Sequence, residues 1–363
     1  MCPGCWNADS LGNQRVVLRY EGSGSGVGKA MGGVVRAVIP WRRRDEDAGR
    51  KRIIVQDSAT GARVRNVWVR SVTREVGDIL FEPVSGKGAY YVYYMPYRNE
   101  GRSNYPKGVY WKPDTTAEAG WLEASAHKSG GATARKAMVE NAIVAEFQSI
   151  DSFNSVYPME VVATAKEVAV LKAKYKDSAF LVFPEDRKYS IRMRRDLPYR
   201  WIRNGPGAPL YGMPGVGEYY AYQLGVYALR SLNDVRVRFG ELRNAEGQRI
   251  TADSMICINT DGVSYDGRPF MKRVDVAAAQ VQALWCVVRV PYDAGGVYTG
   301  TVSVLAGGRK TVVPVRLNVT GRVAGDHGVG TFAADHGVGE PAKMTRLLWL
   351  NSRLALENTV IAP

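Results

Sequence analysis

The sequence predicts a mainly β protein with two antiparallel β-sandwich domains, joined by a segment that contains a short α-helix. Short runs of β-branched and aromatic residues recur along the chain, and glycine-rich turn signals separate them, as is typical of sandwich strands. The chain has 363 residues, more than one ordinary hydrophobic core holds. We therefore expect an N-terminal sandwich at 12–131, a connecting segment at 132–205, a second, immunoglobulin-like sandwich at 206–325 and a linker at 326–363.

Six strand candidates occupy the first block of the chain. Turn-forming residues at Asp57–Gly61 and Ser85–Gly88 separate neighbouring candidates, because glycine adopts a positive φ without steric cost. This pattern predicts hairpins that pack as a sandwich rather than as an isolated sheet. The candidates are Arg15–Tyr20, Val34–Pro40, Arg52–Gln56, Val64–Val72, Ile79–Pro83 and Ala89–Pro96.

The connecting segment contains a predicted helix at about 165–175. Thr164 and Glu167 have the spacing of a capping box, in which each side chain bonds the backbone N–H of the other residue. Val168, Leu171 and Tyr175 follow at helical intervals. A short helix that begins at Ala165 satisfies both signals.

Other parts of this middle region have weaker patterns. Residues 115–131 are polar and rich in alanine and glycine, which predicts a surface excursion. Residues 143–150 fit a helix and a strand equally well. Phe180–Pro184 predicts a strand, and residues 204–209 predict a loop into the second sandwich. The strand candidates of that sandwich are Glu218–Tyr227, Val235–Phe239, Trp285–Pro291, Gly300–Leu305 and Val312–Val319.

The four cysteines do not form a metal-binding pattern. Cys2 and Cys5 are a single Cys-x-x-Cys without the second ligand pair that a zinc site needs. Cys257 and Cys286 lie in apolar, strand-like runs, so they fit buried small side chains, or an intersheet disulfide if the compartment is oxidising. We therefore predict no metal and no other cofactor.

Charge leaves a minor alternative open. The net charge is +14 and arginine supplies 34 of the 49 basic residues, with dense clusters at Trp41–Arg44 and Arg187–Arg203. Acidic residues interrupt both clusters, which indicates a salt-bridged surface; polyanion binding remains the alternative, and no nucleic-acid partner is expected. No apolar run reaches the roughly 20 residues of a membrane helix, so no membrane partner is expected either.

Few residue patterns carry catalytic chemistry. Gly22–Lys29 lacks the spacing and the following helix of a phosphate-binding loop. Asp326, His327, Asp335 and His336 belong to a short tandem repeat whose simplest interpretation is a solvated loop. Paired carboxylates catalyse glycoside hydrolysis.

Two pairs of adjacent acidic residues are therefore candidates for such catalysis. Asp45–Glu46 lies in a charged turn beside arginines. Glu185 and Asp186 follow a strand and are the better catalytic candidates, although a surface ion-pair cluster explains Glu-Asp-Arg-Lys more simply.

Aromatic residues crowd one predicted hairpin and its exit. Sugar rings stack their C–H faces on exposed aromatic planes, so this density suggests carbohydrate contact. Strand alternation places Tyr91 and Tyr93 on one face, opposite Tyr90, Val92 and Tyr94, and one of the two faces must be core. The candidate carbohydrate-binding residues are Tyr91, Tyr93, Tyr97, Tyr105 and Trp111.

Several longer motifs resemble one family. The chain is similar to the N-terminal half of glycoside hydrolase-like proteins of glycoside hydrolase family 123, whose founding activity is β-N-acetylgalactosaminidase. The resemblance runs from about Trp6 to the end of the chain. The motifs that carry it are Trp41–Asp45, Gly88–Tyr97, Tyr157–Val161, Leu181–Arg187, Tyr222–Tyr227 and Arg346–Ser352.

The resemblance implies two β-sandwich domains before a TIM-like barrel that holds a catalytic Asp–Glu pair, with the substrate acetamido group as nucleophile. No equivalent pair is placed here, so we expect a non-catalytic region that supports a sugar-hydrolysing barrel, with the barrel itself missing from this chain. The alternative is a stand-alone carbohydrate-binding or adhesion module. The implied partner is carbohydrate of the N-acetylhexosamine type. The implied location is extracellular, although the sequence begins without a secretory signal.

Overall fold

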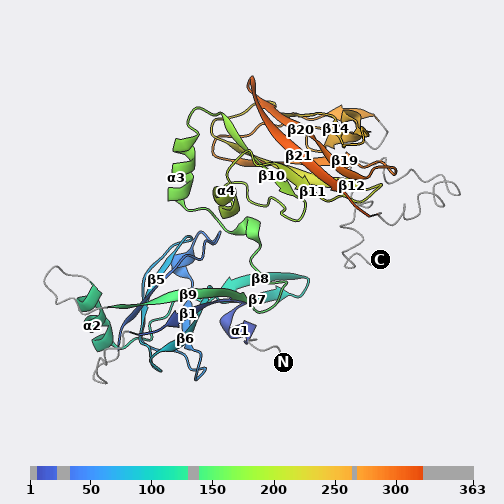
Figure 1. Ribbon diagram of the computed structural model, residues 1–363. Helices are drawn as coiled ribbons and strands as arrows, with labels where there is room; N and C mark the ends of the chain where they lie inside the picture. The colour runs from blue at the N-terminus through green and yellow to red at the C-terminus, as the bar shows by residue number, and fades with distance from the viewer. Residues whose placement is uncertain (1–5, 23–32, 130–138, 264–267, 322–363) are drawn as a thin grey trace. The chain divides into compact units, whose positions relative to one another are not determined.

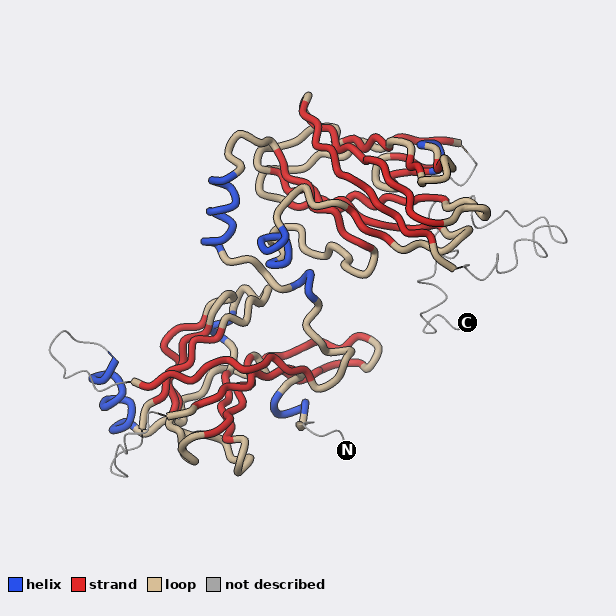
Figure 2. The backbone as a smooth tube through the Cα atoms, in the orientation of Figure 1, coloured by secondary structure: helices blue, strands red, loops and turns tan. Residues whose placement is uncertain are grey.

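The computed structural model describes residues 6–22, 33–129, 139–263 and 268–321 (Figure 1). The Cys-x-x-Cys, most of the glycine-rich loop and the Asp–His repeat lie outside these ranges. The chain divides into two compact units, Met1–Val162 and Ala163–Pro363, which are described separately. Strands dominate both units, as the red tube in Figure 2 shows, so the predicted mainly β class is confirmed.

Unit 1 contains a seven-stranded sheet of order β3-β6-β1-β9-β2-β5-β4 and a separate hairpin, β7–β8. Its elements are α1 (Ala8–Leu11), β1 (Gln14–Tyr20), β2 (Val35–Ile39), η1 (Ala48–Arg50), β3 (Ile53–Asp57), β4 (Val67–Val72), β5 (Gly77–Phe81), β6 (Gly88–Tyr94), β7 (Tyr97–Arg102), β8 (Tyr105–Tyr110), α2 (Ala119–Ser129), β9 (Glu140–Ser149) and η2 (Pro158–Glu160).

Strand β9 joins the two halves of the seven-stranded sheet. The first part of β9 pairs in parallel with β2, and the rest pairs antiparallel with β1. The two halves of the sheet then share one core, in which the rings of Phe81 on β5 and Tyr90 on β6 lie 4.9 Å apart. The unit is therefore a sandwich with one strand common to both layers, and its β2–β9 pair departs from the predicted antiparallel pattern.

Residues 115–131 form more than the predicted surface excursion. Helix α2 lies within them, and Trp121 near its start is only 7% exposed. Trp121 packs with Val34 and Leu80 in a small cluster on the outer side of the sheet. One buried indole is enough to fix the helix, because a ring of this size removes a large apolar area from water. The residue composition alone did not reveal helix α2.

Unit 2 is a sandwich of two sheets. One sheet has the strand order β10-β12-β19-β16, and the other has the order β11-β21-β20-β14-β15, with β13 also paired to β20. One apolar cluster fills the space between the two sheets. Its elements are α3 (Ala165–Lys174), β10 (Phe180–Asp186), α4 (Tyr199–Asn204), β11 (Leu210–Gly212), β12 (Tyr219–Ala228), β13 (Arg236–Phe239), β14 (Leu242–Arg243), β15 (Arg249–Ile250), η3 (Ala252–Ser254), β16 (Met255–Cys257), β17 (Asp261–Val263), β18 (Pro269–Met271), β19 (Val281–Arg289), β20 (Gly296–Ala306) and β21 (Arg309–Val319).

The middle region is divided between the units. Residues 143–150, which fit either structure, form most of β9 and complete the sheet of unit 1. The capping box is present: the Thr164 hydroxyl accepts from Glu167 N, the Glu167 carboxylate accepts from Thr164 N, and α3 ends one residue before the predicted Tyr175. Strand β11, which follows the predicted loop at 204–209, pairs in parallel with β21.

Candidate functional site

Glu185 and Asp186 lie at the end of β10, and the two side chains leave opposite faces of the sheet. Phe180 and Val182 belong to the inner core, and Asp186, which shares their face by strand alternation, accepts a hydrogen bond from the hydroxyl of the core residue Tyr220. Glu185 lies on the outer face, beneath α4. Two carboxylates on opposite sheet faces cannot flank one glycosidic bond, which paired catalysis requires.

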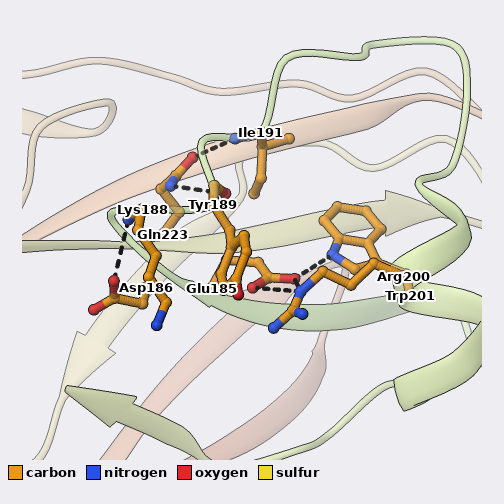
Figure 3. A network of polar contacts seen from close by, with 8 residues as sticks. All are labelled: Glu185, Asp186, Lys188, Tyr189, Ile191, Arg200, Trp201 and Gln223. Atoms are coloured by element: carbon orange, nitrogen blue, oxygen red, sulfur yellow. Dashed lines mark hydrogen bonds and ion pairs between the residues drawn. The ribbon is translucent and has the colours of Figure 1, made fainter. Parts of the chain in front are cut away.

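Glu185 is held in a buried ion pair (Figure 3). Arg200 Nε donates to both carboxylate oxygens, at 2.9 and 3.2 Å, and Trp201 Nε1 donates to Oε1 at 3.0 Å. Glu185 is 4% exposed; burial raises the pKa of its carboxyl, and the bonds from Arg200 and Trp201 oppose that rise. With its oxygens engaged by α4, this carboxylate fastens the helix to the sheet and has no open side toward a substrate.

The same network continues along β12. Gln223 Oε1 accepts from Ile191 N at 2.8 Å, and the Arg200 guanidinium lies 3.9 Å from the centroid of the Tyr189 ring (Figure 3). The sequence signal available for this network was Gln223, a polar residue within the apolar run Tyr219–Ala228; in the structure it lies directly opposite Glu185. The acidic pair was interpreted as surface charge; an ion pair is present, with Glu185 buried and Arg200 partly exposed.

The aromatic candidates of unit 1 separate into three environments. Tyr93 has no exposed surface, and its hydroxyl donates to Gln56 Oε1 at 2.9 Å. Tyr91 is half-buried, and the Arg15 guanidinium lies 3.8 Å from its ring centroid. Tyr105 is 81% exposed near the tip of the β7–β8 hairpin. None of these three rings lines a cavity that the structure describes.

Tyr97 lies at the base of the hairpin, directly opposite Tyr110, with 5.7 Å between the ring centroids. Both rings line a cavity of about 100 Å³ together with polar side chains. The polar groups are largely bonded to one another. Asp45 accepts hydrogen bonds from Tyr110 at 3.2 Å and from Lys51 at 2.7 Å. Burial, followed by the charge of Asp45, raises the pKa of Tyr110 to about 12.

Trp111 follows Tyr110 and lines a second cavity, of about 270 Å³. Its backbone N–H donates to Pro96 and its carbonyl accepts from Arg52 N, so the extended segment is fixed at both sides of the ring. The other lining residues are Ser10, Leu11, Arg52, Ile54, Gln56 and Arg63. This volume is just below the roughly 300 Å³ at which typical ligand sites begin, whereas the Tyr97 cavity holds little more than ordered water.

The walls of the Trp111 cavity are fixed but not fully bonded. Asp114 holds Arg63 through two bonds of 2.9 Å, and the buried Tyr93 supports Gln56 from behind. The indole N–H of Trp111 is buried and has no hydrogen-bond partner among the described residues. An unpaired buried donor costs about 1–3 kcal/mol. The cavity therefore combines an aromatic ring with fixed hydrogen-bonding side chains, and the unpaired indole N–H is buried within the fold.

The arginine clusters bind acidic side chains within the units. Arg187 pairs with Glu218, which has no exposed surface, and Arg44 pairs with Glu160 at 2.9 Å. Among the described residues, no group of three or more His, Cys, Asp or Glu side chains is placed to hold a metal ion. In the same part of the chain, no helix has the length and apolarity to span a membrane.

Cys257 and Cys286 are buried free thiols, as the first of the two interpretations expected, and their placement does not fit the alternative of an intersheet disulfide. Cys257 on β16 and Cys286 on β19 lie directly opposite each other in one sheet. Apolar periodicity cannot distinguish neighbours within a sheet from neighbours across a sandwich, because both kinds of residue face the same core.

Residues 4–150 match the model of the N-terminal domain of glycoside hydrolase 123. This part of the chain is thus related to the N-terminal domain of a glycoside hydrolase family, which confirms the resemblance over these residues. A search of curated proteins found no significant match.

Several solved structures align with part of the chain at low identity. A family 123 glycoside hydrolase from Clostridium perfringens is 11% identical, with a TM-score of 0.31, and the match covers 40% of this chain and 27% of that structure. The major subunit of Myf fimbriae from Yersinia enterocolitica is 13% identical over 32% of this chain and 94% of its own, with a TM-score of 0.20. A chaperone–tip adhesion subunit complex of Acinetobacter baumannii Csu pili is 11% identical over 35% and 64%, with a TM-score of 0.21.

Proposed function

We propose that this chain is a non-catalytic β-sandwich region of a carbohydrate-active protein, and that it supports a sugar-hydrolysing barrel domain. The match of residues 4–150 to the N-terminal domain of a glycoside hydrolase family is the observation that carries this proposal. The buried ion pair of Glu185 supports it as well, because the best acidic candidate is occupied by Arg200 and Trp201.

The test is a hydrolysis assay on the purified chain. Aryl N-acetyl-β-galactosaminide and aryl N-acetyl-β-glucosaminide should give no turnover above buffer. A Glu185→Gln variant serves as the internal control, because it removes the carboxylate and keeps an oxygen acceptor for Trp201. Turnover by the natural chain that this variant abolishes would overturn the proposal and assign a catalytic role to Glu185.

The second candidate function is carbohydrate binding by unit 1 itself, and the Trp111 cavity favours it. Aromatic rings offer large rigid contact areas at low entropic cost, and arginine and glutamine side chains donate to sugar oxygens. The cavity places one indole beside Arg52, Arg63 and Gln56. The glycan class that we propose is N-acetylhexosamine, which the resemblance of the sequence motifs implies. Such binding would hold a glycan near a barrel, or anchor the chain to glycans without one.

Calorimetry with N-acetylhexosamine glycans tests this second function. Saturable binding should be lost in Trp111→Ala and retained in Tyr105→Ala, because Tyr105 is exposed on the same hairpin but lines neither cavity. Tyr97→Ala tests the smaller cavity separately. Binding that disappears in Tyr97→Ala and persists in Trp111→Ala would assign the glycan site to the smaller cavity. The absence of saturable binding to any of these glycans would reject a binding role for this chain.

A further inference from the structure

Two opposed thiols lie inside unit 2, apart from the cavities of unit 1. Cys257 ends the short strand β16, at the edge of the sheet, and Cys286 lies in the middle of β19. Both side chains have no exposed surface, and both sulfur atoms are free. A strand of three residues at a sheet edge has few bonds to hold it, so any covalent link there would have a large effect on local opening.

The register decides whether these thiols can be joined. Cys257 pairs with Cys286, and at the next position Ile258 N donates to Trp285 O at 2.9 Å. Hydrogen-bonded and non-hydrogen-bonded pairs alternate along an antiparallel ladder, so the cysteines occupy a non-hydrogen-bonded position. There the Cα atoms are about 4.5 Å apart and the side chains approach each other, which lies inside the range of about 4.4–6.8 Å that disulfides span.

We propose that Cys257 and Cys286 form a cross-strand disulfide that locks β16 to β19. Both side chains face the same core, so the two sulfur atoms come together when β16 pairs with β19. A thiolate is the attacking species in thiol–disulfide exchange.

The oxidant is a disulfide, either oxidised glutathione or the active-site disulfide of an oxidoreductase. The thiolate of one cysteine attacks one donor sulfur, forms a mixed disulfide and releases one donor thiolate. The thiolate of the other cysteine then attacks the sulfur of the first cysteine and releases the second donor thiolate. Two electrons pass to the donor, and the two protons lost by the cysteines convert the released thiolates to thiols. Because both cysteines are buried, this exchange takes place before β16 docks, during folding.

The test is to refold the full chain in a glutathione redox buffer and map its tryptic peptides without reduction. Arg249, Lys272, Arg273 and Arg289 flank the two cysteines, so the expected product links residues 250–272 to residues 274–289. A Cys2→Ser/Cys5→Ser variant should give the same link, which excludes exchange with the N-terminal pair. If both cysteines remain fully alkylatable after this refolding, the proposal is overturned.

Stability provides the second readout. The oxidised chain should have a Tm roughly 5–10 °C above that of the reduced chain. Single Cys257→Ala and Cys286→Ala variants should each lose this response to reductant; if only one of them does, the bond joins a different partner. A linked peptide accompanied by an unchanged or lower Tm would contradict the locking role, because it would mean that the bond strains the sheet instead of securing its edge.

Discussion

The indole ring of Trp201 lies parallel to the phenyl ring of Phe183, with 4.4 Å between the ring centroids and 1° between the planes. Gly225 of the neighbouring strand makes this possible. A Cβ at that position would lie 2.3 Å from Trp201 Cη2, closer than real contacts allow. The absence of a side chain on β12 thus creates the space that α4 fills.

A Gly225→Ala substitution should therefore destabilise unit 2 by about 1–3 kcal/mol, the usual cost of overpacking. Thermal unfolding measures the loss, and tryptophan fluorescence reports the displaced indole. Gly295→Ala is the matched control, since nothing lies within 4 Å of its added Cβ. Equal stability of the two variants would show that the ring moves without cost.

Glu185→Gln should lower the free energy of unfolding by about 1–3 kcal/mol, because Arg200 loses a charged hydrogen-bond partner in a buried site. Chemical denaturation is the appropriate measurement. Glu246→Gln is the control, because Glu246 is exposed in the same unit. A change no larger than that of the control would mean that solvent replaces the carboxylate fully.

Trp111→Phe should weaken glycan binding about 3–10-fold while Trp111→Ala abolishes it. The phenyl ring keeps a stacking face but offers a smaller area of contact than the indole. Titration calorimetry separates the two variants. Wild-type affinity in Trp111→Phe would show that the larger area of the indole does not contribute to binding.

Stability should fall as the pH rises from 10 toward 12, because of buried tyrosines in unit 1. Burial raises the pKa of Tyr90 from 10.0 to about 12, with a further contribution from Asp57. The fold favours the neutral phenol, so this stabilisation is complete below the unfolded pKa and is lost as the pH passes through the folded pKa. Tyr90→Phe should flatten part of the decline in Tm over that interval; an unchanged slope would exclude Tyr90 as its source.

The hairpin alternation shows how far sequence reasoning reached. Tyr90, Val92 and Tyr94 were assigned to one face, and all three belong to the core of unit 1. Tyr93 on the other face is also fully buried, because Trp6, from a remote segment, lies edge-on to its ring at 5.6 Å. Local periodicity reports one covered face, and it contains no information on what distant segments cover the other.

The two candidate sites also depend on residues that are distant in the sequence. Aromatic density identified Trp111, but its cavity depends on Ser10, Leu11 and Ile54, which come from other segments. Glu185 was placed among its sequence neighbours, whereas its partner Arg200 is 15 positions away on a helix that sequence did not predict. Sequence analysis therefore found residues with useful chemistry, and the fold decided which of them remain available.

Strand β9 also determines when unit 1 can complete its sheet during synthesis. Gln14 pairs with Ser149, which is synthesised 135 residues later (149 − 14), a delay of roughly 7–27 s at about 5–20 residues per second. Until then each half of the sheet ends in an edge that nothing covers. The nascent chain therefore passes through an interval in which it is most open to aggregation and to capture by chaperones, and that interval closes only when β9 joins the two halves.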